Sequence, residues 1–273
     1  AYTNYDLPSK ESDSYEYNII KCLYRDQDKI LCGTNVGTIY SFDLKTKKFS
    51  WFYDLNERRS VYFLNRNMNG QLMIGGVSQH GFSLLSRDGK WQRTFPVKGS
   101  KDVYFSDVKC ILEVEKDVYL IGTRNEGVYY YNYNTHSLKN YKNDNEKQEE
   151  NQIPGNYITD IIKDSRGEIW IGTYGGGISR FHLKSEQFTT YNTQHDLLNN
   201  YVCKIVEDDD KHLWISSIIG VSEFDPMNEQ FTNYTHHNGI RVNEFTHHAG
   251  LKLSNGNIAF SGNNGFILFN PQT

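Results

Sequence analysis

The residues of this chain best suited to chemistry are polar and aromatic side chains in short glycine-containing loops and just before strand-like runs. Amides, tyrosines and one Arg–Glu pair suit a sugar ligand, because hydroxyl groups take paired hydrogen bonds and the C–H face of a pyranose stacks on an aromatic ring. The alternative is that Asn and Gly serve turn geometry alone. The candidate ligand-binding residues are Asn35, Gln79, His80, Arg124, Asn125, Glu126, Tyr174, Tyr201, Asn243, Glu244, Asn263 and Asn264, with Asn156, Tyr157 and Asn200 beside them.

A sixfold repeat positions these residues. Each repeat has a strand-like stretch ending in a pair of small residues, then a tight loop and another strand. The pairs follow one another at 42, 47, 50, 44 and 45 residues: Gly33-Thr34, Gly75-Gly76, Gly122-Thr123, Gly172-Thr173, Ser216-Ser217 and Ser261-Gly262. A repeat of this length cannot bury its own apolar face and must stack on its neighbours. We interpret the pairs as positions at which the backbone turns within each repeat.

The fourth repeat predicts four short antiparallel strands, at residues 157–163, 168–173, 178–183 and 188–191, with a turn at 164–167. Four such strands make one blade of a β-propeller. The fold class predicted is therefore all-β, a propeller of four-stranded blades forming one domain, 1–273. In this fold, the loops between second and third strands share one face with the blade-to-blade segments. The predicted blades span residues 17–55, 61–95, 104–142, 153–192, 197–235 and 239–270.

The last repeat shows three strands and stops at Asn270-Pro271. Tyr2-Thr3-Asn4-Tyr5 matches the fourth strands Phe188-Thr189-Thr190-Tyr191 and Phe231-Thr232-Asn233-Tyr234. We therefore expect the N-terminal strand (residues 2–5) to complete the last blade, which removes an exposed sheet edge. The count is six blades, or seven if the chain is a fragment.

Composition excludes several classes of protein. With 37% hydrophobic and 23% charged residues the chain is typical of soluble globular proteins. A net charge of -4 argues against a nucleic-acid partner. No stretch approaches the roughly 20 apolar residues of a membrane-spanning helix. The first residues of the chain are polar, which is typical of a mature protein and not of a signal peptide. The sequence therefore does not identify the cellular compartment.

The cysteines do not form a framework. Cys22, Cys110 and Cys203 occupy similar places in their repeats, and we expect them to be small buried hydrophobic residues. A bridge between Cys22 and Cys32 is conceivable. There is no CxxC zinc spacing, and no cofactor is predicted.

The sequence gives little support for a catalytic function. Glycoside hydrolysis needs two facing carboxylates, and nothing pairs Glu126 with Glu244. Asp164 and Asp208 to Asp210 fall in turns at the opposite end, where solvated turn chemistry explains them. A lyase needs a positioned histidine, and the candidates are His236-His237 and His247-His248. Adjacent histidines in a strand point to opposite faces, so neither pair is a ready-made metal site. The repeat assigns Trp170, Trp214, Tyr191 and Tyr234 to packing between blades.

The stretch Asp164-Ser165-Arg166-Gly167-Glu168-Ile169-Trp170-Ile171-Gly172-Thr173-Tyr174-Gly175-Gly176-Gly177-Ile178 resembles the two-component regulator propeller repeat. The stretch from Asn243-Glu244-Phe245 through Ser261-Gly262-Asn263-Asn264-Gly265-Phe266 to Phe269-Asn270-Pro271 resembles the closing blade that precedes the immunoglobulin-like domain in hybrid two-component sensors of glycan-degrading gut bacteria. Such proteins usually hold two seven-bladed propellers, a transmembrane helix and a cytoplasmic histidine kinase.

The resemblance implies a periplasmic, non-catalytic sensor domain of an inner-membrane histidine kinase. Its expected partners are an oligosaccharide, a second propeller and an immunoglobulin-like domain of the same chain, and a second copy in a homodimer. Neither nucleic acid nor membrane insertion is expected of this segment. Two alternatives stay open: a free-standing propeller lyase or glycoside hydrolase, and a structural protein-interaction platform.

Overall fold

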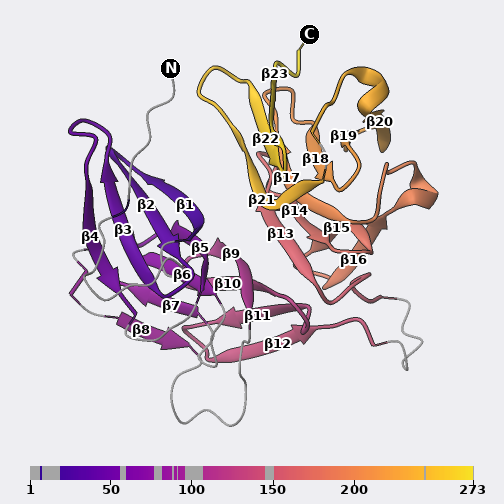
Figure 1. Cartoon of the computed structure of the whole chain (residues 1–273). Coiled ribbons are helices and arrows are strands. Elements are labelled where there is room, and N and C mark those ends of the chain that lie inside the picture. Colours follow the sequence, from indigo (N-terminus) through magenta and orange to yellow (C-terminus); the bar gives the residue numbers. More distant parts are fainter. Residues whose placement is uncertain are drawn as a thin grey trace. The chain divides into compact units, whose positions relative to one another are not determined.

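The computed structural model describes residues 7, 19–55, 60–76, 82–87, 89–90, 92–95, 107–144, 151–242 and 244–272, with the backbone alone at 92–95. The described residues form six antiparallel sheets, the blades of the predicted β-propeller, with almost no helix among them (Figure 1). The predicted N-terminal strand, Tyr2 to Tyr5, lies outside the described residues. The part of the chain that the structure describes includes two 3-10 turns, η2 (Thr193–His195) and η3 (His236–Asn238).

Each blade is an antiparallel sheet of consecutive strands, and the last has three strands among the described residues. The first and second blades are β1 (Ile20–Asp26), β2 (Lys29–Thr34), β3 (Thr38–Asp43), β4 (Phe49–Asp54), and β5 (Val61–Arg66), β6 (Leu72–Gly76), β7 (Phe82–Leu85), β8 (Gln92–Phe95). The third and fourth are β9 (Val108–Glu115), β10 (Val118–Thr123), β11 (Val128–Asn132), β12 (Ser137–Tyr141), and β13 (Ile158–Lys163), β14 (Ile169–Thr173), β15 (Gly177–His182), β16 (Gln187–Tyr191). The fifth and sixth are β17 (Val202–Glu207), β18 (Leu213–Ser217), β19 (Val221–Asp225), β20 (Gln230–Tyr234), and β21 (Phe245–Lys252), β22 (Ile258–Gly262), β23 (Gly265–Phe269).

The chain divides into two compact units, unit 1 (residues 1–118) and unit 2 (residues 119–273). Within each unit the apolar cores lie between consecutive blades. In unit 1 the core joins blades one and two through residues such as Leu31, Val61 and Leu72. In unit 2 one core joins blades four and five, around Trp170 and Phe224, and another joins blades five and six. The second strands of blades two, four and five (β6, β14 and β18) are buried along their whole length, because neighbouring blades cover both of their faces.

The small-residue pairs have a different role from the one expected. Gly172 lies within β14, and a Cβ added there would stand 2.7 Å from Cγ1 of Val202, the first residue of the next blade. Gly33 meets Val61 in the same way, at 2.6 Å. The glycine therefore permits close approach of the next blade and makes no turn. The following hydroxyl fixes the loop, because Thr173 Oγ1 donates to the carbonyl of Gly177 at 2.9 Å.

No disulfide joins the four cysteines, all of which lie in the described part of the chain, and Cys32, Cys110 and Cys203 are buried. Cys22 pairs with Gly33 across the ladder, whereas Cys203 is the bulged residue between Val202 and Lys204, so the two are offset by one position. The thiol of Cys22 donates to the carbonyl of Val61 at 3.3 Å, and that of Cys203 to the carbonyl of Phe245 at 3.1 Å. Burial raises the pKa of each of these two thiols to about 12, which makes them unreactive.

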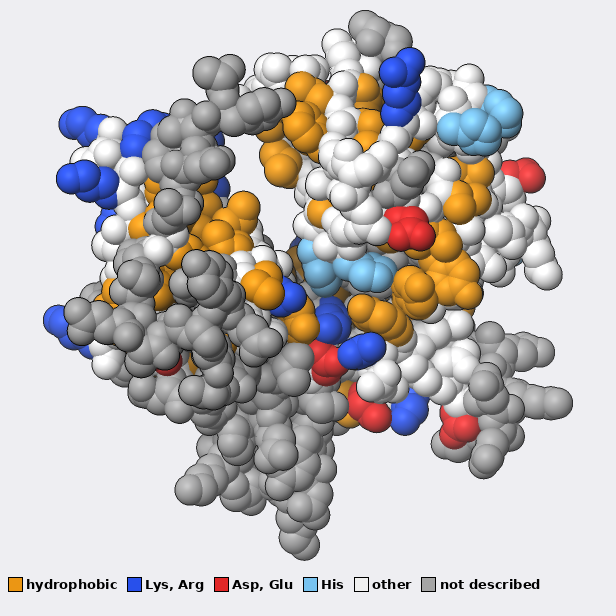
Figure 2. Space-filling view, viewed as in Figure 1, with side chains coloured by type: hydrophobic (Ala, Val, Ile, Leu, Met, Phe, Trp, Pro, Cys, Tyr) orange, Lys and Arg blue, Asp and Glu red, His pale blue; other side chains and the backbone are white. Residues whose placement is uncertain are grey.

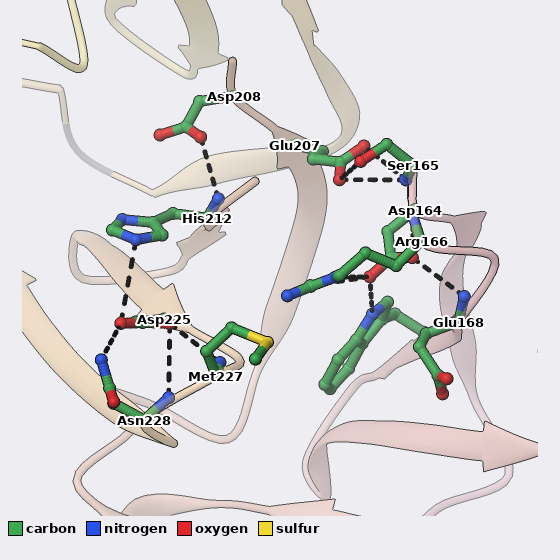
Figure 3. Close-up of polar contacts among 11 residues, drawn as sticks. Asp164, Ser165, Arg166, Glu168, Glu207, Asp208, His212, Asp225, Met227 and Asn228 are labelled. Atoms are coloured by element: carbon green, nitrogen blue, oxygen red, sulfur yellow. Dashed lines mark hydrogen bonds and ion pairs between the residues drawn. The ribbon is translucent and has the colours of Figure 1, made fainter. Parts of the chain in front are cut away.

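Two of the turn aspartates are buried, which corrects the expectation of solvated turns. One oxygen of Asp164 accepts from the backbone N–H groups of Arg166 and Glu168, and the other accepts from Trp170 Nε1 at 3.0 Å (Figure 3). Asp208 holds Trp214 Nε1 in the same way, at 2.8 Å. The carboxylate thus orients the tryptophan that fills the space between blades. Sequence reasoning assigned these tryptophans to packing correctly, since Trp170 is fully buried.

We expect replacement of Asp164 by asparagine to lower the free energy of unfolding at neutral pH by roughly 1–3 kcal/mol. Burial alone raises the pKa of this carboxyl, but hydrogen bonds from Trp170 and Arg166 outweigh burial and hold it below its ordinary value of 3.8. A depressed pKa stabilises the fold above the unfolded value and loses that effect as pH falls through the folded value. Below about pH 4 the wild type should therefore lose stability more steeply than the Asp164→Asn variant, measured by urea unfolding at several pH values.

The matched control is Asp209→Asn in the equivalent turn of the next blade. The Asp209 side chain is 64% exposed and forms a surface ion pair with Lys252, so its replacement should change stability by less than about 1 kcal/mol. Equal acid sensitivity of the wild type and the Asp164→Asn variant would contradict the assignment.

Candidate functional site

In unit 2 the loops between second and third strands are hydrogen-bonded to the segments that join blades. Gly175 and Gly177 both donate to the carbonyl of Asn200 at 3.0 Å, and Gly127 donates to the carbonyl of Asn156 at 3.0 Å. Tyr174 N–H donates to the carbonyl of Tyr157 at 2.9 Å. The two sets of segments therefore share one face of unit 2, as the fold predicted.

Three tyrosines gather on this face and form what we call the tyrosine platform, Tyr157, Tyr174 and Tyr201. Tyr174 follows β14, while Tyr157 and Tyr201 immediately precede β13 and β17. The ring centroids of Tyr174 and Tyr201 are 4.5 Å apart, and those of Tyr157 and Tyr174 are 5.4 Å apart. Tyr174 and Tyr201 remain 41% and 39% exposed. Contiguous exposed apolar surface can mark a binding site, so these two adjacent rings are the candidate ligand-binding surface.

His247 of blade six joins the platform. Its ring centroid lies 5.5 Å from that of Tyr157 and 5.3 Å from that of Tyr174. Figure 2 shows histidine side chains beside hydrophobic ones in the middle of the view, over the part of unit 2 where Figure 1 labels β13 and β21. Blades four, five and six thus contribute to one continuous group of rings.

Arg124, from the loop after β10, borders the platform on the side of blade three, and Glu126 lies in the same loop. The guanidinium carbon of Arg124 lies 5.9 Å from the centroid of Tyr157, a cation–π distance. Glu126 forms an ion pair with Lys142 at 3.1 Å and accepts at its carbonyl from Asn140. Asn125 is exposed in the same loop.

The candidates of blade six form hydrogen bonds within the same blade. Asn263 Nδ2 donates to Glu244 Oε2 at 2.7 Å, and Asn264 Nδ2 donates to the carbonyl of Arg241 at 3.0 Å. These amides serve the local turn, which favours the alternative of turn geometry for both. In unit 1, Asn35 Oδ1 accepts from Ile19 N at 3.2 Å and so fixes the entry to β1. Gln79, His80 and Asn243 lie outside the described residues.

The histidine pairs differ from the expectation in one respect. His236 and His237 lie in η3 rather than in a strand, with ring centroids 3.8 Å apart. His247 and His248 lie in β21, with centroids 6.5 Å apart. Among the residues that the structure describes, no group of three or more His, Cys, Asp or Glu side chains could hold a metal ion.

A second polar cluster surrounds His212 in the turn before β18. His212 Nδ1 lies 2.8 Å from Glu223 Oε1, and Glu223 Oε2 accepts from the hydroxyl of Tyr234 at 3.0 Å. Burial lowers the pKa of His212, but the hydrogen bond to Glu223 and the charges of Asp208 and Asp225 outweigh it and raise the pKa overall. Asp225 in turn accepts from Met227 and Asn228 (Figure 3). Because each carboxylate serves a turn or a strand partner, this cluster is structural.

Sequence reasoning placed Tyr174 and Tyr201 on the loop face, but it considered His247 only as a lyase candidate and not for the ligand site. The signal was available in the spacing of the repeats. Tyr157 precedes Ile169 by 12 residues and Tyr201 precedes Leu213 by 12, whereas Glu244 precedes Ile258 by 14. The two additional residues form a wider bulge in β21, and this bulge carries His247.

Comparison with known proteins agrees with the fold and the repeat. The family model of the two-component regulator propeller matches residues 152–175. Histidine kinase P4 of Formosa agariphila is 25% identical over an alignment of 330 residues that covers 99% of this chain and 23% of the relative. The chain therefore spans less than a quarter of that curated relative.

Solved structures of the same fold include sensors and enzymes. The extracellular domain of a hybrid two-component system from B. thetaiotaomicron superposes with a TM-score of 0.71 at 20% identity, over 94% of this chain and 32% of that chain. A virginiamycin B lyase of Staphylococcus aureus superposes with a TM-score of 0.72 at 16% identity, over 97% of this chain and 83% of that chain.

No helix in the described ranges is long and apolar enough to cross a membrane.

The match of the family model, the histidine kinase relative and the extracellular sensor domains together confirm the resemblance predicted from the sequence. The chain carries a two-component regulator propeller repeat within a propeller similar to the extracellular domains of hybrid two-component systems.

Proposed function

We propose that this chain is the ligand-sensing propeller of a hybrid two-component sensor kinase and that it binds an oligosaccharide without transforming it. The observation that carries the proposal is the tyrosine platform. Tyr174 and Tyr201 present adjacent exposed rings, with Tyr157 in contact with Tyr174 and Arg124 over the ring of Tyr157. Stacking on such rings suits the C–H faces of sugar residues, while phenol hydroxyls and the guanidinium supply hydrogen bonds.

The platform is suited to recognition because its members are held in place. The backbone of Tyr174 is bonded to that of Tyr157, and Tyr174 and Tyr201 form a β-bridge. Tyrosine has few rotatable bonds, so it offers a large contact area at low cost in conformational entropy. A ligand therefore meets a surface already in its binding geometry.

The setting proposed for this site is periplasmic. The similarity to extracellular domains of two-component systems supports it, as does the short share of the histidine kinase relative that the chain covers. In this proposal the rest of the protein supplies a second propeller, an immunoglobulin-like domain and a cytoplasmic kinase, and two copies form a homodimer. Ligand favours one arrangement of these parts over another, and the difference in affinity between the two arrangements drives the signal.

Calorimetry of the purified chain tests ligand binding directly. The panel is cellohexaose, xylohexaose, mannohexaose, laminarihexaose and tetragalacturonate, each titrated and then recovered for mass spectrometry after overnight incubation. The proposal expects saturable heat with one sugar, which is recovered intact. Saturable heat followed by a cleaved product would instead support the lyase or hydrolase alternative. Absence of heat with every sugar would contradict an oligosaccharide site in this chain and favour the interaction-platform alternative.

A further inference from the structure

We infer that His247 is a specificity-determining residue of the sugar site and that the wide bulge of β21 is what places it there. The inference rests on the proposed function, because it assigns a role within the same site. It adds the imidazole to the hydrogen-bonding groups proposed above, the phenol hydroxyls and the guanidinium of Arg124.

His247 occupies a defined place among the rings. It forms a nearly equilateral triangle with Tyr157 and Tyr174, whose three centroid distances are 5.5, 5.3 and 5.4 Å. Tyr174 and Tyr201 form the exposed layer, whereas Tyr157 and His247 are only partly exposed. The imidazole therefore lies in the floor of the site, next to the rings on which a sugar would stack.

The bulge that carries His247 is wider than its counterparts. Phe245 pairs with Gly262 and Gly250 with Phe260, so four residues of β21 (246–249) stand opposite the single residue Ser261. In β17 only Cys203 is extra, since Val202 pairs with Ser217 and Lys204 with Ser216. Bulges of this kind re-aim a side chain out of the regular ladder. His248 within the bulge takes a left-handed backbone conformation, with φ of 62°.

Packing and hydrogen bonds hold both ends of the bulge in place. Phe245 is buried at its start, and its carbonyl accepts from the thiol of Cys203 at 3.1 Å. At its end, a Cβ added to Gly250 would stand 2.4 Å from Cδ1 of Phe260, so the strand packs there without a side chain. Thr246 Oγ1 also donates to the carbonyl of Ser261 at 3.2 Å. These contacts fix the position of the His247 side chain relative to Tyr157 and Tyr174.

The role follows from the chemistry of the imidazole. The Nδ1 atom of His247 is buried, so Nε2 is the nitrogen assigned to the ligand. Stacking on tyrosine discriminates weakly between sugars, because most pyranoses offer an apolar face. A hydrogen bond to one hydroxyl discriminates strongly, since an analogue without that hydroxyl leaves a polar group unpaired. His247 would thus select the sugar residue that places a hydroxyl over the floor of the site.

The test compares His247→Phe, which keeps a ring, with His247→Gln, which keeps a hydrogen-bonding group. The probes are the panel hexasaccharide or tetrasaccharide that binds the wild type, and its monodeoxy analogues. We expect His247→Phe to weaken binding about tenfold, equivalent to about 1.4 kcal/mol, and His247→Gln to recover part of that loss. One deoxy analogue should bind the wild type about tenfold more weakly yet bind His247→Phe as well as the parent sugar does.

The control is His237→Phe in η3, an exposed histidine outside the triangle, which should leave affinity unchanged. Circular dichroism and thermal unfolding of each variant check that the fold is retained. Unchanged binding by His247→Phe, or equal losses for the deoxy analogue in both proteins, would overturn the role of His247 while the sugar site stands. Failure of the wild type to bind every sugar would instead remove the proposed function itself.

Discussion

Replacing Trp170 with alanine is expected to lower the free energy of unfolding by about 3–5 kcal/mol. Trp170 is fully buried between blades four and five, where its ring contacts those of Phe224, at 5.6 Å, and Tyr191, at 6.1 Å. Its removal would leave a cavity and would also leave the buried Asp164 carboxylate without one of its donors. Urea and thermal unfolding of the full chain measure the effect.

Two variants make the expectation specific. Trp170→Phe keeps most of the apolar contact and should cost clearly less than the alanine variant, with the remaining loss due to the missing indole N–H. Met227→Ala removes a side chain that is 77% exposed and should change stability by no more than about 0.5 kcal/mol. A decrease in the free energy of unfolding of less than about 1 kcal/mol for Trp170→Ala would contradict this expectation. It would mean that neighbouring side chains fill the space left by the indole ring.

Replacing Tyr174 with alanine should weaken sugar binding roughly thirtyfold, or about 2 kcal/mol. Tyr174 contacts Tyr157, Tyr201 and His247, so it is the ring on which the others depend. Its loss removes one stacking surface and frees the rings on either side. Because Tyr174 is 41% exposed, stability should change far less than binding does. Calorimetry with the panel sugar that binds the wild type gives the affinity, and thermal unfolding gives the stability.

Tyr133→Ala is the matched control for this variant. Tyr133 also lies beside a histidine, His136, at 5.9 Å, but in the turn between β11 and β12. Its removal should leave sugar affinity unchanged. If Tyr133→Ala and Tyr174→Ala weakened binding equally, the sugar would not be bound at the tyrosine platform.

The blades could be predicted from sequence because their signals are local. The strand predicted at residues 168–173 is β14, and the one predicted at 188–191 is β16, each with a boundary shift of one residue. Alternation, turn residues and the repeat spacing carry this information within each blade.

The roles of Gly172 and Asp164 could not be predicted in the same way. Their partners lie in the next blade or inside the packed space: Val202 approaches Gly172, and Trp170 turns the carboxylate of Asp164 inward. A local pattern identifies a turn aspartate but says nothing about what buries it. The single-domain assignment of residues 1–273 stays a prediction.

For the candidate site, too, the local positions could be predicted from sequence and the long-range contacts could not. Tyr174 and Tyr201 fall at equivalent loop positions, so the repeat predicts their common face. Contact between their rings, and between these and His247, depends on long-range geometry and on the irregular register of β21. Irregular positions in a repeat are where function is expected to interrupt the pattern, and the longer spacing from Glu244 to Ile258 was the clue in the sequence.

The double donation from Gly175 and Gly177 to the carbonyl of Asn200 has a kinetic consequence. Both glycines have left-handed backbones, with φ of 112° and 87°, and together they clamp the loop of Tyr174 to the next blade before any ligand arrives. Association should then be a single step without loop closure, at the rate set by docking alone. Differences between sugars would appear in how long each complex lasts, so residence time would be the quantity through which this propeller distinguishes one glycan from another.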